Sequence, residues 1–136
     1  MVKHTSSIRI RYADTDQMKY AYYGKFFEYF EQGRSDLLRS IGLPYSRVEE
    51  MGLFLPVIEA HASYKKAARY DDLLAIEVWP ALIERVRLNF AHRILNQDGK
   101  LILEAETFHV CAGVNEKPKR LPEELAAQLA PYLNRR

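Results

Sequence analysis

The spacing of the apolar residues differs in one stretch of this sequence from that before and after it, and this difference limits the possible folds more than any other feature. Between residues 23 and 41 the apolar side chains recur with the 3.6-residue period of an α-helix. One broad stripe collects Phe26, Phe27, Phe30, Leu37, Leu38 and Ile41. Gly42 follows the last of them, at a position where helices often end. Before and after this stretch apolar and polar residues alternate, which predicts β-strands packed against one long helix.

The predicted strands can be placed along the chain. The first covers residues 6–13, with Ile8, Ile10 and Tyr12 on one face. After the helix, alternating segments lie at residues 54–64, 74–79, 85–94 and 101–114. Asp98-Gly99 is a strong signal for a hairpin turn between the last two. With short helices expected at 44–51 and 122–133, the pattern predicts one α+β domain over residues 1–136, an antiparallel sheet covered by a helix.

Composition excludes several classes of protein. A chain of 136 residues with 48% hydrophobic content can build one domain with its own core. A net charge of +2 is too small for a nucleic-acid-binding surface, which needs a concentrated basic stripe. No apolar run is long enough to cross a bilayer, nothing suggests a membrane surface, and residues 1–10 do not resemble a signal peptide. The single cysteine, Cys111, excludes an intrachain disulfide and predicts a cytoplasmic location.

Two segments together resemble a known family. The first, RYADTDQMKYAYYGKFFEYFEQGRSDLLRSIGLPY, has an aromatic-x-Asp-x-Asp pattern, a short loop and a helix that begins with aromatic residues. The second, ASYKKAARYDDLLAIEVWP, places a Tyr-Asp-Asp turn before a strand. The combination resembles the 4-hydroxybenzoyl-CoA thioesterase-like family of acyl-CoA thioesterases, from about Ile8 to Pro122. The resemblance implies a hotdog fold, in which an antiparallel five-stranded sheet curls around one long central helix.

The same resemblance implies an activity and an assembly. The expected reaction is hydrolysis of an acyl-CoA thioester to free acid and CoA. We expect it to need no metal and no redox cofactor, and coenzyme A enters only as part of the substrate. Relatives protect their sheet edges by forming a dimer with one continuous sheet, often stacked into tetramers. We therefore expect a homodimer or homotetramer, with the active site between subunits.

The resemblance also assigns site residues. The catalytic carboxylate falls on Asp16, the second aspartate of the pair. Tyr23 and Gly24 fall where the family's helix begins, and their backbone N–H groups would polarise the thioester carbonyl. Tyr12 matches a tyrosine that some members place near the site. The chain departs from the pattern at Lys19, where glycine is usual, and at Tyr23, where many bacterial relatives have histidine.

The chemistry of these residue types agrees with that assignment. A carboxylate can attack the thioester and form a mixed anhydride, or it can deprotonate water. Free N–H groups and the dipole at a helix N-terminus stabilise the charge that develops on the carbonyl oxygen. Judged without the family pattern, Asp16 would be an ordinary loop or capping aspartate. Asp14 is the rival carboxylate, although a hydrogen bond to the loop backbone is its simpler role, and Glu31 on the helix is the second alternative.

Coenzyme A also carries phosphates that basic side chains could bind. The candidates are Lys65, Arg69, Arg85, Arg87, Lys119 and Arg120, although most strand charges are simply exposed. The histidines at positions 4, 61, 92 and 109 lack the spacing of metal ligands, and His61 and His109 are expected to be structural. Cys111 is expected to be a buried, inert thiol.

Two other functions remain open at this point. Hotdog hydratases and dehydratases use a histidine paired with an acid, and no histidine lies in the loop and helix between residues 11 and 45. A non-catalytic acyl-CoA-binding module would usually carry an output domain, for which 136 residues leave no room. The sequence does not specify the acyl group, the choice between CoA and acyl carrier protein, or the role of Asp16 as nucleophile or base.

Overall fold

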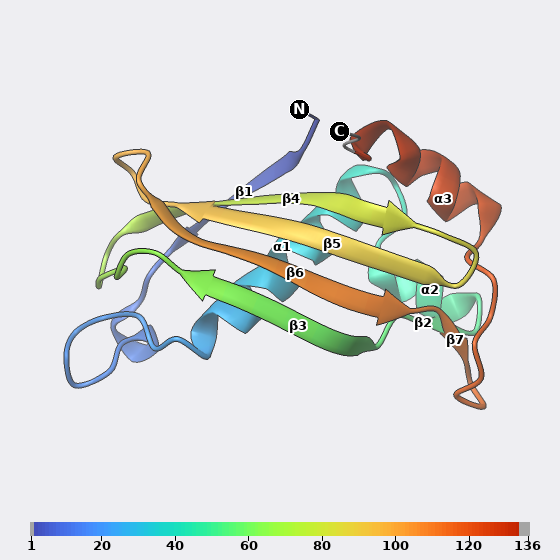
Figure 1. Ribbon diagram of the computed structural model, residues 1–136, viewed down its shortest axis with the longest axis horizontal. Helices are drawn as coiled ribbons and strands as arrows, with labels where there is room; N and C mark the ends of the chain where they lie inside the picture. Colours follow the sequence, from blue (N-terminus) through green and yellow to red (C-terminus); the bar gives the residue numbers. More distant parts are fainter. Residues whose placement is uncertain (1, 134–136) are drawn as a thin grey trace.

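The computed structural model describes residues 2–133, and an antiparallel sheet forms its centre (Figure 1). The strand order is β1-β4-β5-β6-β3, and each neighbouring pair is antiparallel. The strands are β1 (His4–Arg9), β3 (Val57–Tyr64), β4 (Leu73–Ile83), β5 (Arg87–Leu95) and β6 (Leu101–Val110). The predicted turn at residues 96–99 joins β5 to β6. The α+β class and the five-stranded antiparallel sheet are as predicted.

Helix α1 (Lys25–Ser40) lies across one face of this sheet (Figure 1). Its buried side chains include Phe26, Phe30 and Leu37, and they join the buried residues of the sheet in one core. At Gly33 a side-chain Cβ would lie 2.7 Å from Cγ2 of Val78 and 2.9 Å from Cγ2 of Ile76. Glycine therefore permits the close approach of α1 to β4.

Two further helices and a small sheet complete the fold. Helix α2 (Tyr45–Glu50) follows α1, and α3 (Glu123–Leu129) lies near the end of the described chain, as the sequence predicts. Strands β2 (Leu53–Phe54) and β7 (Ala112–Gly113) form a two-stranded sheet. No helix within residues 2–133 is both long enough and apolar enough to cross a membrane.

Several details differ from the sequence prediction. The strand predicted at 101–114 ends at Val110, and residues 112–113 belong to the small second sheet. The first strand ends at Arg9, and residues Tyr12–Asp14 form a 3₁₀ turn, so Tyr12 is exposed and does not share a strand face with Ile8. The predicted strand at 54–64 is split at Pro56, because proline has no N–H to donate to a ladder. Phe27 belongs to the predicted apolar stripe of α1 but is 42% exposed.

Candidate active site

Asp14 anchors the loop that connects β1 to α1. Its carboxylate is 3% exposed, and Oδ2 accepts hydrogen bonds from the backbone N–H of Arg11 at 3.0 Å and the hydroxyl of Tyr29 at 3.1 Å. Oδ1 accepts from the Arg11 guanidinium at 3.2 Å and lies 3.4 Å from Nζ of Lys25. Burial raises the pKa of Asp14, but these hydrogen bonds outweigh burial and the net pKa lies below its ordinary value. Asp14 therefore hydrogen-bonds the loop backbone, which is the simpler of the two roles considered for it.

Asp16 lies two residues further along, exposed, at the start of a tight turn. Its Oδ1 accepts from the backbone N–H groups of Met18 at 2.9 Å and Tyr20 at 3.4 Å. Within residues 2–133, Oδ2 has no hydrogen-bond donor. Lys19 has φ of 66°, the left-handed conformation that explains why glycine is usual at this position. One carboxylate oxygen of Asp16 is thus fixed by the turn and the other is free.

The chain enters α1 through Tyr23 and Gly24. Gly24 is the N-cap of α1, and the Tyr64 hydroxyl donates a 2.9 Å hydrogen bond to the carbonyl oxygen of Tyr23. Neither the N–H of Tyr23 nor that of Gly24 donates to an acceptor within residues 2–133. Free N–H groups at a helix N-terminus can bind an oxyanion.

Asp16 and Gly24 line the same open hollow, which has a volume of about 380 Å³. Asp14, Tyr22, Lys25 and Glu28 also line it. The side chain of Tyr23 is 63% exposed and packs against the rings of Tyr22 and Tyr64, with centroids 4.7 Å and 6.4 Å away. The structure therefore brings Asp16 and Gly24 to one hollow, whereas Tyr23 is not among its lining residues.

Sequence reasoning did not single out Lys25 and Glu28 as lining residues. Their Nζ and Oε2 atoms form an ion pair of 3.1 Å on the first turn of α1. The three-residue spacing of opposite charges was the available signal, since residues i and i+3 are neighbours on a helix. Tyr64 was also missed, because its contact with Tyr23 joins residues that are distant in the sequence.

The predicted substrate-binding residues separate into two groups. Tyr12, Lys65 and Arg69 lie at the end of the sheet that holds Asp16, where Tyr12 packs on Tyr70 and Arg69 lies 5.4 Å from the centroid of the Tyr20 ring. The second group, at the opposite end, consists of Arg85, Arg87, Lys119 and Arg120.

The separation of the two groups follows from strand register. Tyr64 pairs with Leu103 and Arg87 pairs with Val110, seven residues further along β6. At about 3.3 Å per residue, the two ends lie roughly 23 Å apart. A single chain therefore does not bring all seven predicted residues to one site.

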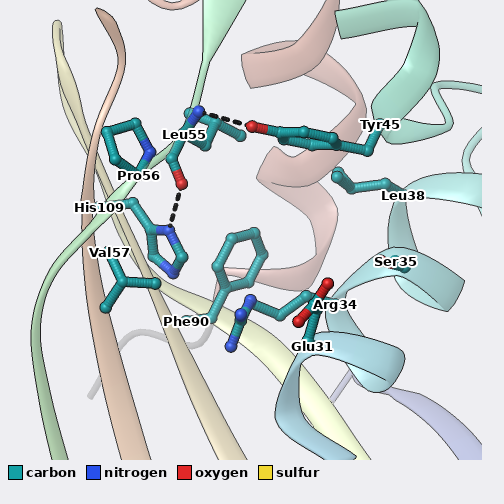
Figure 2. A pocket seen from close by; sticks show the side chains of 10 residues that line it. All are labelled: Glu31, Arg34, Ser35, Leu38, Tyr45, Leu55, Pro56, Val57, Phe90 and His109. Atoms are coloured by element: carbon teal, nitrogen blue, oxygen red, sulfur yellow. Dashed lines mark hydrogen bonds between the residues drawn. The ribbon is translucent and has the colours of Figure 1, made fainter. Parts of the chain in front are cut away.

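A second hollow, of about 310 Å³, lies between α1, residues 55–57 and the sheet (Figure 2). Glu31, Arg34 and His109 are among the residues that line it. His109 Nδ1 lies 2.9 Å from the carbonyl oxygen of Leu55, so this nitrogen must donate. Nε2 therefore accepts from the Thr107 hydroxyl at 2.9 Å. Burial lowers the pKa of His109 to about 4, so the ring is neutral and structural, as expected.

The rest of the chain offers little metal or thiol chemistry. Cys111 is buried, and burial raises the pKa of its thiol, which agrees with an inert side chain. Within residues 2–133 no group of three or more His, Cys, Asp or Glu side chains is placed to hold one metal ion.

Comparison with known proteins places the chain in a family. A model of the thioesterase-like superfamily matches residues 10–129. The chain belongs to this superfamily. The acyl-CoA thioester hydrolase YbgC of Escherichia coli is 28% identical over 122 residues, covering 89% of this chain and 91% of YbgC.

Solved structures agree with the superfamily assignment. A Thermus thermophilus protein superposes with a TM-score of 0.88 at 34% identity, over 94% of this chain and 98% of that one. The DHNA-CoA thioesterase of Staphylococcus aureus gives a TM-score of 0.85 at 30% identity, over 89% and 82% of the two chains. The antiparallel α+β fold described above is therefore of the hotdog thioesterase type.

Proposed function

We propose that this protein hydrolyses an acyl-CoA thioester to a free acid and CoA, with Asp16 as the catalytic carboxylate. The observation that carries the proposal is the shared hollow, in which Asp16 and the start of α1 face the same space. The free Oδ2 of Asp16 and the free N–H groups of Tyr23 and Gly24 supply a nucleophile or base and an oxyanion site. The names of the superfamily and of YbgC support the same reaction.

Two routes are compatible with this arrangement. In the first, Oδ2 of Asp16 attacks the carbonyl carbon, the CoA thiolate leaves and takes up a proton, and water hydrolyses the resulting anhydride. In the second, Asp16 removes a proton from water, and the hydroxide attacks the carbonyl and displaces the CoA thiolate. Both routes consume one water and place negative charge on the carbonyl oxygen. That oxygen would accept from the N–H groups of Tyr23 and Gly24.

For the substrate's phosphates we propose Lys65 and Arg69 as the first partners, with Tyr12 beside them. These residues lie at the same end of the sheet as Asp16, and the backbone of Arg69 bridges to Tyr20 in the Asp16 turn. Arg85, Arg87, Lys119 and Arg120 are about 23 Å further along the strands and would need to come from a second subunit. No cofactor other than the substrate's own CoA is required.

We further propose a homodimer, or a homotetramer built from it, in which α1 is the central helix of the hotdog. Strand β3 is an edge of the sheet, and nearly all of its residues are exposed. Val57 and Ile58 add apolar surface to this edge. An exposed strand edge pairs readily with another chain, and a second copy would cover it. The single, buried Cys111 suits a reducing cytoplasm.

The alternative functions have less support. A hydratase or dehydratase needs a histidine at the site, and no histidine lines the hollow around Asp16. A non-catalytic acyl-CoA-binding module would not need a carboxylate with one free oxygen beside unpaired helix N–H groups. Neither alternative explains the site as completely as hydrolysis does.

The experiment that tests the proposal measures CoA release with a thiol reagent over a panel of aliphatic and aromatic acyl-CoAs. Asp16→Asn should lower kcat at least roughly a hundredfold on the best substrate, which is the low end for loss of an acid–base group. Asp98→Asn, in the exposed hairpin turn, is the matched control and should keep full activity. Near-normal turnover by Asp16→Asn, together with an inactive Asp14→Asn, would show that Asp14 and not Asp16 is the catalytic carboxylate.

A further inference from the structure

The hollow between α1 and the sheet contains a positive charge without a carboxylate partner. Arg34 lines it and is only partly exposed. No carboxylate oxygen within residues 2–133 lies within 4.0 Å of an Arg34 nitrogen. The contact that the structure shows for Arg34 is to Nε2 of His92, at 3.4 Å. A guanidinium has five N–H donors, so most of those on Arg34 remain available.

The surrounding groups add donors. The hydroxyl of Tyr45 accepts from the backbone N–H of Leu55 at 3.0 Å and keeps its own proton to donate (Figure 2). Ser35 is also in the lining, and its hydroxyl is a further donor. Both ring nitrogens of His109 already have hydrogen-bond partners, in Leu55 and Thr107. Arg34, Tyr45 and Ser35 thus offer donors to this hollow, and a carboxylate is the group that satisfies several donors at once.

Glu31 is the carboxylate that lines the same hollow. It lies on α1 on the same side as Arg34, and it is exposed (Figure 2). Glu31 is exposed and forms no ion pair with Arg34. Solvent therefore screens the negative charge of Glu31 more than it screens the positive charge of Arg34. Removing the Glu31 charge should therefore strengthen the attraction of this hollow for an anion.

A stripe on α1 joins this hollow to the proposed oxyanion site. Gly24, Phe27, Glu31, Arg34 and Leu38 follow spacings of three and four residues, so they share one face of the helix. The ten residues from Gly24 to Arg34 correspond to about 15 Å along the helix axis. Phe27 lies between Gly24 and Arg34 in the sequence, outside the lining of either hollow, and presents an apolar, exposed ring. An acyl chain that begins at Gly24 can follow Phe27 and end beside Arg34.

We propose that this hollow receives the far end of the acyl group, and that Arg34, Ser35 and Tyr45 select acyl groups that end in a carboxylate. The proposal rests on the proposed thioesterase function and specifies its substrate class as mono-CoA thioesters of dicarboxylic acids. Arg34 supplies a charge-assisted, two-pronged contact to the terminal carboxylate. The apolar middle of the chain packs on Phe27 and Phe90.

The test compares chains of equal carbon number that differ only at the far end. Suberoyl-, sebacoyl- and dodecanedioyl-CoA are assayed against octanoyl-, decanoyl- and dodecanoyl-CoA, and each pair gives a ratio of kcat/KM. The native protein should favour the carboxylate-ended member of at least one pair by roughly tenfold or more. Because each ratio comes from one preparation, partial loss of folded protein cancels.

Four variants make the test specific to Arg34. Arg34→Gln should remove the preference, and Arg34→Lys should retain part of it. Glu31→Gln should increase the ratio, and it remains informative if Arg34→Gln fails to fold. Arg39→Gln, an exposed arginine on the same helix that pairs with Asp36, should leave the ratio unchanged.

The two proposals fail in different ways. A native preference for methyl-ended chains, or a ratio that is the same in Arg34→Gln and the native protein, overturns the inference about Arg34 and leaves the thioesterase function in place. If the native protein cleaves none of the acyl-CoAs faster than they hydrolyse without it, the thioesterase proposal itself is overturned.

Discussion

The hydroxyl of Tyr64, the last residue of β3, donates a 2.9 Å hydrogen bond to the backbone carbonyl of Tyr23 at the entry to α1. The bond joins the edge strand of the sheet to the segment that carries the proposed oxyanion donors. The aromatic rings of Tyr23 and Tyr64 also meet edge to face, with centroids 6.4 Å apart. We infer that Tyr64 orients the peptide units of Tyr23 and Gly24.

The first prediction concerns this orientation. Tyr64→Phe removes one neutral hydrogen bond, which contributes about 1 kcal/mol, so kcat should fall roughly fivefold with little change in KM. Steady-state kinetics on the best acyl-CoA measure both constants. Tyr70→Phe, an exposed tyrosine without a hydroxyl contact in residues 2–133, is the control. A kcat for Tyr64→Phe equal to that of the control would show that the bond does not affect the site.

The second prediction concerns Asp14 and pH. The folded-state pKa of Asp14 lies below its unfolded value, because hydrogen bonds from Arg11 and Tyr29 outweigh the effect of burial. Ionised Asp14 therefore stabilises the fold at pH values above its unfolded pKa, and this stabilisation is lost as the pH falls through its folded pKa. Asp14→Asn should lower the free energy of unfolding by roughly 1–3 kcal/mol at pH 7.

Denaturant unfolding of both proteins between pH 7 and pH 3 measures this effect. The difference between native protein and Asp14→Asn should shrink toward the acidic end of the range. Asp71→Asn, at an exposed position, should show no such convergence. A difference that is constant with pH would mean that the Asp14 charge does not contribute to stability.

The sequence predicts the sheet and helices well because their signals are local. The period of two and the period of 3.6 depend on neighbours within a few residues. The features that were not predicted correctly depend on contacts between residues that are distant in the sequence. Phe27 fits the apolar stripe of α1 but faces outward, and the contact of Gly33 with β4 depends on residues more than forty positions away.

The candidate site shows the same division. Asp16 and Gly24 could be predicted because they belong to one continuous motif, and they do line one hollow. The sequence could not show which basic residues lie near Asp16, because charge alone does not indicate at which end of the sheet a side chain lies. Arg34 lies in a hollow against His92, and only the packing of α1 on β5 reveals this contact.

The third prediction concerns assembly through the β3 edge. Light scattering should give a particle of at least two 15.9 kDa chains at micromolar concentration. Ile58→Asp places a charge on this exposed apolar edge and should shift the protein toward monomer, because desolvating an unpaired charge is costly. Val2→Asp, next to the opposite edge strand β1, should leave the mass unchanged. A native particle of one chain would contradict both the dimer and a shared site.

The last prediction concerns Tyr23, whose backbone N–H and side chain can be separated by substitution. The N–H donates to no acceptor within residues 2–133, and the exposed ring packs against its aromatic neighbours. Tyr23→Phe keeps the N–H and the ring, so kcat should stay within roughly tenfold of the native value. Tyr23→Pro removes the N–H, and kcat should fall about a hundredfold or more, which is the effect of deleting an oxyanion donor.

Gly24→Pro tests the second donor in the same way, with circular dichroism to confirm that α1 is intact. If Tyr23→Phe were as inactive as Asp16→Asn, the hydroxyl would be the catalytic group and the backbone oxyanion site would be the wrong assignment.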